Sequence, residues 1–384
     1  MKRTKTLFLA GLLAMMSSCS QNGYDTDFGD VNNDITNILN LPSEPYNYAN
    51  PDLPNHFLGN NVVRIDNTPN NNQITDAGAT LGRVLFYDTK LSANNSVSCA
   101  SCHSQSAGFA DNRVLSLGFE GGETGRNSMG LANARYYNNG RFFWDERAST
   151  LEEQVLMPIQ DAVEMGLTLD ELVSKIQAAA YYQPLFTEAF GDASVTSSRI
   201  SLALSQFVRS MVSFESRYDE GLASVNGNNN VDFPNFSEIE NLGKNLFFSG
   251  RTQCANCHET VTFSGDQARN NGLDAVNSDL GLGAVTGNAR DNGKFKVNSL
   301  RNIALTAPYM HDGRFETLEE VIGFYDRGIQ NNQNLDNRLR TNNGAIRRMN
   351  LNPQERQALV AFLRTLTDDN FISDQKFSDP FIDN

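Results

Sequence analysis

The pentapeptide Cys-x-x-Cys-His occurs twice in this chain of 384 residues, at 99–103 and at 254–258. Two thiols followed by a histidine are the pattern for attachment of c-type haem, in which the thiols bond the porphyrin vinyl groups and the histidine binds the iron. Zinc held by paired cysteines is the alternative, but zinc has no need of a histidine directly after each pair. The sequence therefore predicts two covalent haems. Their attachment and axial residues are Cys99, Cys102, His103, Cys254, Cys257 and His258.

The fifth cysteine, Cys19, follows a segment typical of exported proteins. Basic residues at positions 2, 3 and 5 precede the apolar run Leu7 to Met16, which is too short to span a bilayer. Residues 1–18 are predicted to be a lipoprotein-type signal peptide with Cys19 as the lipid anchor, although leucine is commoner than methionine at position 16. A soluble exported form is the alternative. A periplasmic protein agrees with the haem motifs, because c-type haem is attached outside the cytoplasmic membrane.

The charge of the chain limits its partners. Loss of residues 1–18 removes three of the 31 basic residues and none of the 45 acidic ones, so the formal charge falls from -14 to -17. Nucleic acid is therefore excluded as a partner. An acidic surface either steers a basic redox protein to the enzyme or only keeps the chain soluble, and both interpretations stay open.

An internal repeat predicts how the chain is divided. The word Leu-Gly-x-x-Leu-Phe-aromatic stands at 81–87 and at 242–248, shortly before each haem motif. Each copy predicts a leading helix, the first starting at Thr75 and the second at a capping box of Ser237 and Glu240. Residues 198–217 and 353–366 also have helical spacing, and strand signals are weak.

We therefore expect a mainly α fold with two cytochrome c-like haem domains and long irregular loops. Residues 19–73 form an N-terminal extension, residues 74–225 the first, peroxidatic domain, and residues 236–372 the second, electron-transfer domain. The Asn/Gly-rich tract 226–235 is the expected linker.

Longer stretches of the sequence, between residues 74 and 366, resemble those of the bacterial di-haem cytochrome c peroxidases and MauG. One word is Phe143 to Ala148, followed by Gln154, Pro158 and Glu164. Another starts at Leu300-Arg301-Asn302 and continues through Thr306 to Gly313. The resemblance implies that hydrogen peroxide reacts at the first haem.

The same resemblance gives roles to single residues. Glu164 is expected to move a proton between the peroxide oxygens and Gln154 to supply a polar environment, with Pro158 between them. The apolar segment around Glu164 favours a raised carboxyl pKa. Trp144 is expected to relay electrons between the haems. A surface carboxylate and a core tryptophan are the alternatives for Glu164 and Trp144.

A calcium ion between the haems is also implied by the resemblance. The matching positions are Asn127, Thr306 and Pro308. Oxygen ligands, backbone carbonyls included, suit this hard cation.

The chain departs from the peroxidase pattern at two positions. Phe119 stands in the segment where many di-haem peroxidases have a histidine that caps the first haem, so we expect that haem to be open without prior reduction. The remaining histidines, His56 and His311, are interpreted as structural. Tyr325 stands where the peroxidases place a methionine and MauG a tyrosine. A helix capped by Thr317 turns Tyr325 inward, which indicates a ligand of the second haem or a core tyrosine.

Three functions are consistent with the sequence. The first is a peroxidase that reduces hydrogen peroxide with electrons from a small cytochrome or cupredoxin. The second is a MauG-like oxidase that modifies a partner protein through high-valent haem, which the Phe119 and Tyr325 departures favour. The third is a plain di-haem electron carrier, against which the Gln154 and Glu164 pair argues.

Overall fold

Helices and long loops make up residues 35–382, the part of the chain that the computed structural model describes. The predicted signal peptide and Cys19 lie outside these residues. Within them no β-strand forms, only isolated bridges, and no helix is long and apolar enough to cross a membrane. The expectation of a mainly α fold is confirmed. The helices are α2 (Asn60–Val63), α3 (Asp76–Tyr87), α4 (Cys99–Cys102), α5 (Leu151–Gln154), α6 (Met157–Gln160), α7 (Leu169–Ala178), α8 (Tyr182–Phe190), α9 (Ser197–Ser210), α10 (Arg217–Ser224), α11 (Glu238–Phe247), α12 (Leu282–Thr286), α13 (Leu318–Gly323), α14 (Pro353–Arg364) and α15 (Asp369–Ser373).

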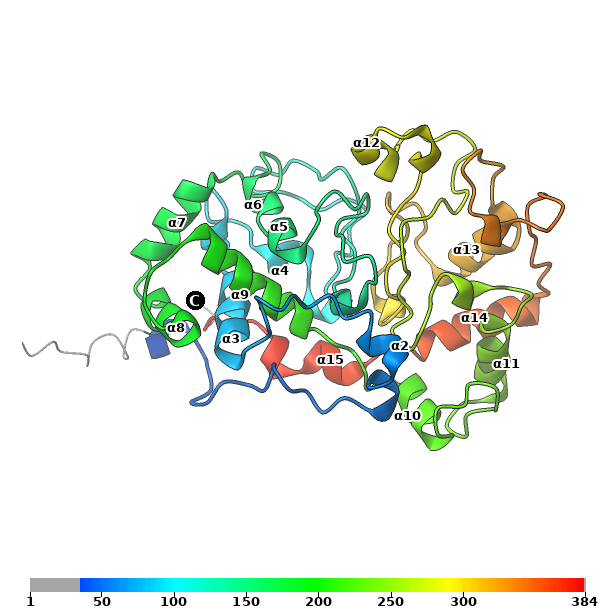
Figure 1. Cartoon of the computed structure of the whole chain (residues 1–384), viewed down its shortest axis with the longest axis horizontal. Coiled ribbons are helices and arrows are strands. Elements are labelled where there is room, and N and C mark those ends of the chain that lie inside the picture. The colour runs from blue at the N-terminus through cyan, green and yellow to red at the C-terminus, as the bar shows by residue number, and fades with distance from the viewer. Residues whose placement is uncertain (1–34, 383–384) are drawn as a thin grey trace, which may run out of the picture.

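The buried apolar side chains gather in two main clusters, which are the cores of two lobes that lie side by side (Figure 1). In the first lobe α3 packs on α9, and in the second α11 packs on α14. The predicted caps are present, since Thr75 accepts a hydrogen bond from the N–H of Gly78 and Ser237 forms a capping box with Glu240. Each haem motif thus follows a helix that is anchored in its own core.

The glycine of the repeated Leu-Gly-x-x-Leu-Phe motif explains why the two helices of each pair pack closely. A Cβ on Gly82 would collide with the backbone of Ala203 in α9, and a Cβ on Gly243 would collide with the backbone of Ala358 in α14. Both partner helices carry Ala-Leu-x-x-Phe, at 203–207 and 358–362. The internal repeat therefore includes the second helix of each pair, which the sequence analysis did not detect.

Replacing Gly243 by alanine is expected to destabilise the protein by about 1–3 kcal/mol, because the added methyl group forces α11 away from α14. The thermal unfolding midpoint of the haem-loaded protein measures this loss. Gly323→Ala is the control, since a Cβ there meets nothing within 4 Å. Equal midpoints for the two variants would contradict the close contact of α11 with α14.

The chain passes from the first lobe to the second between α9 and α10, ahead of the tract expected as a linker. The helix predicted over 198–217 stops at Ser210. The carboxylate of Asp368 then accepts hydrogen bonds from the N–H groups of Phe214 and Glu215 at 2.9 and 3.0 Å, which holds this segment in a non-helical form. Residues 226–235 pack in the second lobe, where Phe233 is buried.

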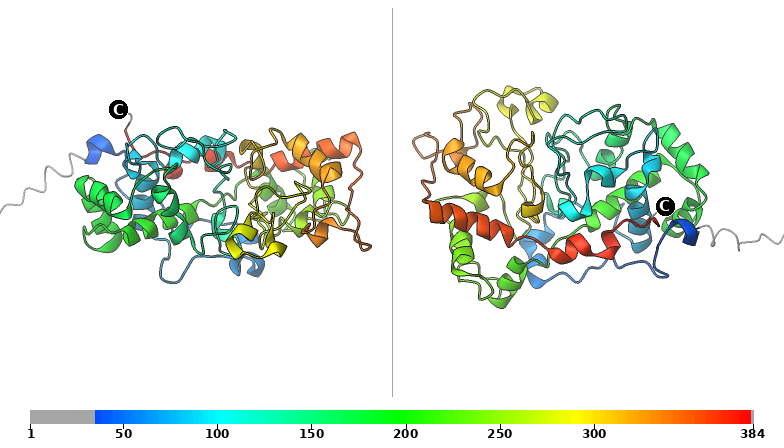
Figure 2. Two further views of the ribbon diagram at one scale, coloured as in Figure 1. Left: turned by 90° about the horizontal axis from the view of Figure 1, so that it is seen from above. Right: turned by 180° about the vertical axis from the view of Figure 1, so that it is seen from behind.

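Both ends of the described chain bridge the lobes. The N-terminal extension places Tyr48 in the first core and Phe57 in the second. The segment after α14 returns to the first lobe, as the view from behind shows (Figure 2). There the hydroxyls of Tyr48 and Tyr87 donate to the carbonyls of Lys376 and Phe377 at 2.6 and 2.7 Å. These two segments therefore connect the two lobes.

Candidate functional site

The first haem motif forms the short helix α4, which begins at a capping box of Ser98 and Ser101. His103 follows as the last residue of the motif. Its Nδ1 bonds the carbonyl of Phe109 at 2.9 Å, so Nε2 is the nitrogen left to bind a metal. Burial lowers the pKa of His103, which keeps the ring neutral, the form that coordinates iron.

The second motif repeats this arrangement. Nδ1 of His258 bonds the carbonyl of Phe263 at 3.2 Å, and burial lowers the pKa of His258 to about 4. Phe109 and Phe263 have φ of 60° and 51°, a conformation that non-glycine residues seldom adopt. Because both carbonyls orient a haem-motif histidine, the strained backbone has the same use in each lobe.

One pocket, lined mostly by residues of the first lobe, contains the residues predicted to handle peroxide. Its lining includes His103, Trp144, Gln154, Pro158 and Glu164. The short helices α5 and α6 place Gln154 and Pro158 on the wall. A turn places Glu164, since the carboxylate of Asp161 accepts hydrogen bonds from the N–H groups of Val163 and Glu164.

The carboxyl group of Glu164 has the electrostatics of a proton carrier. Burial raises its pKa, the negative charge of Asp161 raises it further, and Arg147 opposes this rise. Asp161 and Arg147 line the same pocket. Neither the Glu164 carboxylate nor the Gln154 amide makes a hydrogen bond to another described residue, so both groups are free to contact a bound molecule.

The loop that carries Phe119 lies beside Glu164 but adds no metal ligand. The N–H of Phe119 donates to the carbonyl of Glu164 at 3.0 Å, and its ring lies against Gly166. Among the described residues that line the first pocket, His103 is the only histidine.

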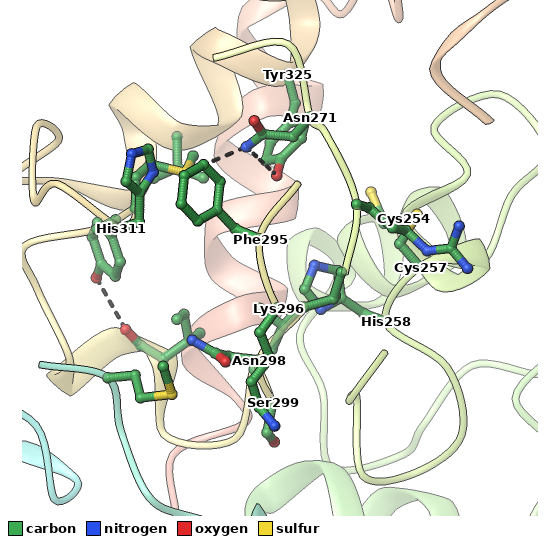
Figure 3. Close-up of a pocket in the computed structure, with 18 of the residues that line it drawn as sticks. Cys254, Cys257, His258, Asn271, Phe295, Lys296, Asn298, Ser299, His311 and Tyr325 are labelled. Carbon is green, nitrogen blue, oxygen red and sulfur yellow. Dashed lines mark hydrogen bonds between the residues drawn. The ribbon is translucent and has the colours of Figure 1, made fainter. Parts of the chain in front are cut away.

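A second pocket surrounds the other haem motif (Figure 3). Cys254, Cys257, His258 and Tyr325 line it. The predicted capping box of Thr317 and Glu320 starts α13, and a π-helical turn over Phe324–Gly328 follows it. The inward direction predicted for Tyr325 is confirmed. Burial raises the pKa of Tyr325 to about 12, while a hydrogen bond from Asn271 to the hydroxyl opposes this rise.

Trp144 lies between the pockets and lines both of them. Its indole N–H donates to the carbonyl of Asn127 at 2.8 Å. His311 meets its ring edge-on at 6.4 Å and stacks on Phe295 at 3.7 Å between ring centroids. An aromatic contact path therefore connects Trp144 to the second pocket.

A buried lysine fixes the loop that carries Trp144. The backbone N–H of Lys296 donates to the carbonyl of Trp144, and its side-chain Nζ donates to the carbonyl of Arg141 at 2.9 Å. This Nζ also lies 3.3 Å from the ring centroid of Tyr137, whose hydroxyl bonds Glu146. Sequence reasoning missed this cluster, because its members have no motif of their own.

The second pocket contains polar atoms that fit haem propionates. The Nε atoms of Arg269 and Arg347 are buried without a hydrogen-bond partner among the described residues, and both arginines line the pocket. Guanidinium groups pair well with carboxylates, and a buried unpaired donor is costly. These donors and His258 together fit a haem with two propionates.

Comparison with known proteins decides the family. The sequence profile described as di-haem cytochrome c peroxidase matches residues 76–227 and 237–377. The chain belongs to the di-haem cytochrome c peroxidase family. It is therefore an oxidoreductase, and the two c-type haems predicted from the repeated motif are confirmed at the level of this family.

Both MauG proteins and cytochrome c peroxidases are similar to the chain in sequence. The methylamine utilization protein MauG of Methylophilus methylotrophus is 34% identical over 301 residues, which cover 78% of this chain and 84% of that protein. Cytochrome c551 peroxidase of Nitrosomonas europaea is 35% identical over 296 residues, which cover 76% and 80%. A solved MauG-like protein associated with microbial copper homeostasis has a TM-score of 0.75 and 34% identity, covering 86% of this chain and 99% of that structure. The di-haem peroxidase family thus includes both functions that the sequence favours.

Proposed function

We propose that this enzyme reduces hydrogen peroxide to water at the first haem, with electrons from an external donor. The observation that supports this best is the pocket in which His103, Gln154 and Glu164 meet. The haem, when bound to His103, supplies an iron on which the O–O bond of peroxide is cleaved. Glu164 accepts the proton of one peroxide oxygen and returns it to the other, and the Gln154 amide hydrogen-bonds the departing water.

Trp144 relays electrons between the two haems in this proposal. Its indole lines both pockets and is held by the Asn127 carbonyl. The external donor, a small cytochrome or cupredoxin, delivers electrons that pass through Trp144 to the first haem. The acidic surface favours a donor with a basic docking face.

We propose that Tyr325 would hold the iron of the second haem together with His258. A phenolate stabilises ferric iron, whereas a thioether stabilises ferrous iron, so this ligand suits a store of oxidising equivalents. Replacing Tyr325 by phenylalanine should leave both haems attached but change the low-spin ferric signal in the electron paramagnetic resonance spectrum. A spectrum identical to that of the wild type would refute ligation by Tyr325.

The test of peroxidase function is steady-state consumption of peroxide by the haem-loaded protein with a small cytochrome or an electron-donating dye. Sustained turnover that consumes two electrons per peroxide is the expected result. Absence of any reaction between the ferric protein and stoichiometric peroxide would contradict the proposal and leave a plain electron carrier.

A MauG-like oxidase is the second candidate, and the Phe119 and Tyr325 departures favour it. The same pocket would then withdraw electrons from a docked protein through Trp144. Negligible turnover with small donors, together with peroxide-dependent oxidation of one specific protein, would support this function in place of the first.

The remaining sequence expectations also stand as proposals. The two buried clusters support a first haem domain at 74–225 and a second at 236–372, with α10 and the segment after α14 exchanged between the lobes. We also propose export to the periplasm and a lipid anchor at Cys19.

A calcium ion is proposed at Asn127, Thr306 and Pro308, which all line the second pocket. The Asn127 amide nitrogen donates to the carbonyls of Arg113 and Val114. No described residue donates a hydrogen bond to the Asn127 side-chain oxygen or to the carbonyls of Thr306 and Pro308. These free oxygens support a hard cation at this place.

A further inference from the structure

The side-chain amide of Asn271 stands between two atoms that can bind iron. Its Nδ2 lies 3.4 Å from the hydroxyl oxygen of Tyr325 (Figure 3). It lies 3.6 Å from the sulfur of Met310. These two distances bring the sulfur and the phenol oxygen within about 7 Å of each other. Met310, Tyr325 and His258 all line the second pocket. Met310 therefore joins Tyr325 as a candidate sixth ligand of the second haem.

The backbone holds Asn271 in this orientation. The N–H of Leu273 donates to the side-chain oxygen of Asn271 at 3.1 Å, which leaves Nδ2 to face Tyr325 and Met310. Gly272, with φ of 73°, makes the turn that presents this amide.

Met310 is held in an unfavourable backbone conformation. Its φ is 76°, a value that residues other than glycine, asparagine and aspartate seldom adopt. The N–H of Tyr309 donates to the carbonyl of Phe315 at 2.7 Å, and the N–H of Gly313 donates to the carbonyl of Met310 at 3.2 Å. Strain of this kind persists where the surroundings fix a residue for a purpose. Here it places a long, flexible thioether on the wall of a haem pocket.

We propose that Met310 replaces Tyr325 as the axial ligand when the second haem is reduced, an inference that rests on the proposed ligation of Tyr325 in the ferric state. The exchange follows from ligand chemistry, since an anionic phenolate favours ferric iron and a neutral, soft thioether favours ferrous iron. When the external donor adds one electron, the bond from iron to the Tyr325 oxygen breaks and the phenolate takes one proton from solvent. A bond from iron to the Met310 sulfur then forms, and oxidation reverses each step.

Asn271 is the positioning residue of this exchange. Its N–H hydrogen-bonds the Tyr325 oxygen and its amide touches the Met310 sulfur, so the ligand that leaves the iron stays beside it. The exchange makes one haem suitable for two tasks, because its ferrous form passes electrons and its ferric form stores an oxidising equivalent.

Proton nuclear magnetic resonance of the fully reduced, haem-loaded protein tests the proposal. A methionine bound to low-spin ferrous haem gives a methyl resonance far upfield, because the methyl group lies over the porphyrin ring. We expect one such resonance in the wild type and in the control Met349→Leu, since Met349 lines the same pocket and Asn271 is hydrogen-bonded to Met310 instead. The resonance should vanish in Met310→Leu and weaken in Asn271→Ala. A reduced wild type without the resonance, or Met310→Leu with it, would overturn the proposal.

A second variant separates this inference from the proposed function. In Tyr325→Phe, Met310 should bind the ferric iron as well, which adds the near-infrared absorption band of a ferric thioether complex. A ferric spectrum of Tyr325→Phe that matches the wild type would refute tyrosine ligation whatever the reduced protein shows. Loss of the wild-type ferric signal would preserve tyrosine ligation, and the methyl resonance of the reduced protein then decides ligation by Met310.

Discussion

Replacement of Glu164 by glutamine should slow the reaction of the ferric enzyme with hydrogen peroxide by about 10²–10⁴-fold, the usual contribution of a positioned acid–base group. Glutamine has nearly the same shape but cannot accept the proton of the bound peroxide. Both haems should stay attached, and the resting spectrum should not change, because Glu164 is not a ligand of either iron. Stopped-flow absorption measures the second-order rate constant.

The pH dependence of the same rate constant identifies the proton carrier. Glu164 must be ionised to accept a proton, and burial and Asp161 raise its pKa against the opposing charge of Arg147. The wild-type rate should therefore fall as the pH falls through this raised pKa, at a higher pH than for an exposed glutamate. The acidic limb should be absent in Glu164→Gln. The control Glu153→Gln changes an exposed carboxylate in the same segment and should retain both rate and limb. A Glu164→Gln variant that keeps the wild-type profile would assign proton transfer to another group.

Replacement of Arg301 by methionine should lower the free energy of unfolding by about 3–5 kcal/mol, the cost of leaving one charge of a buried pair alone. The Arg301 side chain has no exposed surface. Its guanidinium pairs with Asp219, and its Nε donates to the carbonyl of Val261 at 3.0 Å. Although burial opposes ionisation, Arg301 and a hydrogen bond from His56 hold the pKa of Asp219 at about 2. Removing Arg301 therefore leaves the buried Asp219 carboxylate without its guanidinium partner, with hydrogen bonds only from His56 and Ser216.

Urea unfolding of the haem-loaded protein, followed by circular dichroism, measures this loss. Arg364→Met is the matched control, because the pair of Arg364 with Glu319 is exposed at both ends and contributes about 0–1 kcal/mol. Similar stabilities for the two arginine variants would show that Arg301 is not needed to neutralise Asp219.

Local signals made part of this fold predictable. The caps at Thr75, Ser237 and Thr317 involve residues at most three positions apart, so the sequence contains all that fixes these helix starts. The histidines of the two motifs are predictable for the same reason. Part of the pocket around them was predictable from the sequence motif of the family that contains Gln154, Pro158 and Glu164.

Contacts between distant segments were not predictable. The end of α9 depends on Asp368, which lies 153 to 155 positions away. Its carboxylate accepts hydrogen bonds from the hydroxyl of Ser213 and from the backbone N–H groups of Phe214 and Glu215. The periodicity of residues 198–217 indicates one continuous helix, because no local residue signals the competing hydrogen bonds. Asn271, Met310 and Tyr325 likewise meet only after two loops and a helix have folded around one pocket.

We propose that the duplicated motif holds two unequal haems, one open beside Glu164 and one closed by Tyr325. Electron paramagnetic resonance of the resting ferric protein tests this arrangement most directly. One high-spin and one low-spin signal in equal amounts are expected. Two low-spin signals with no high-spin component would contradict an open first haem.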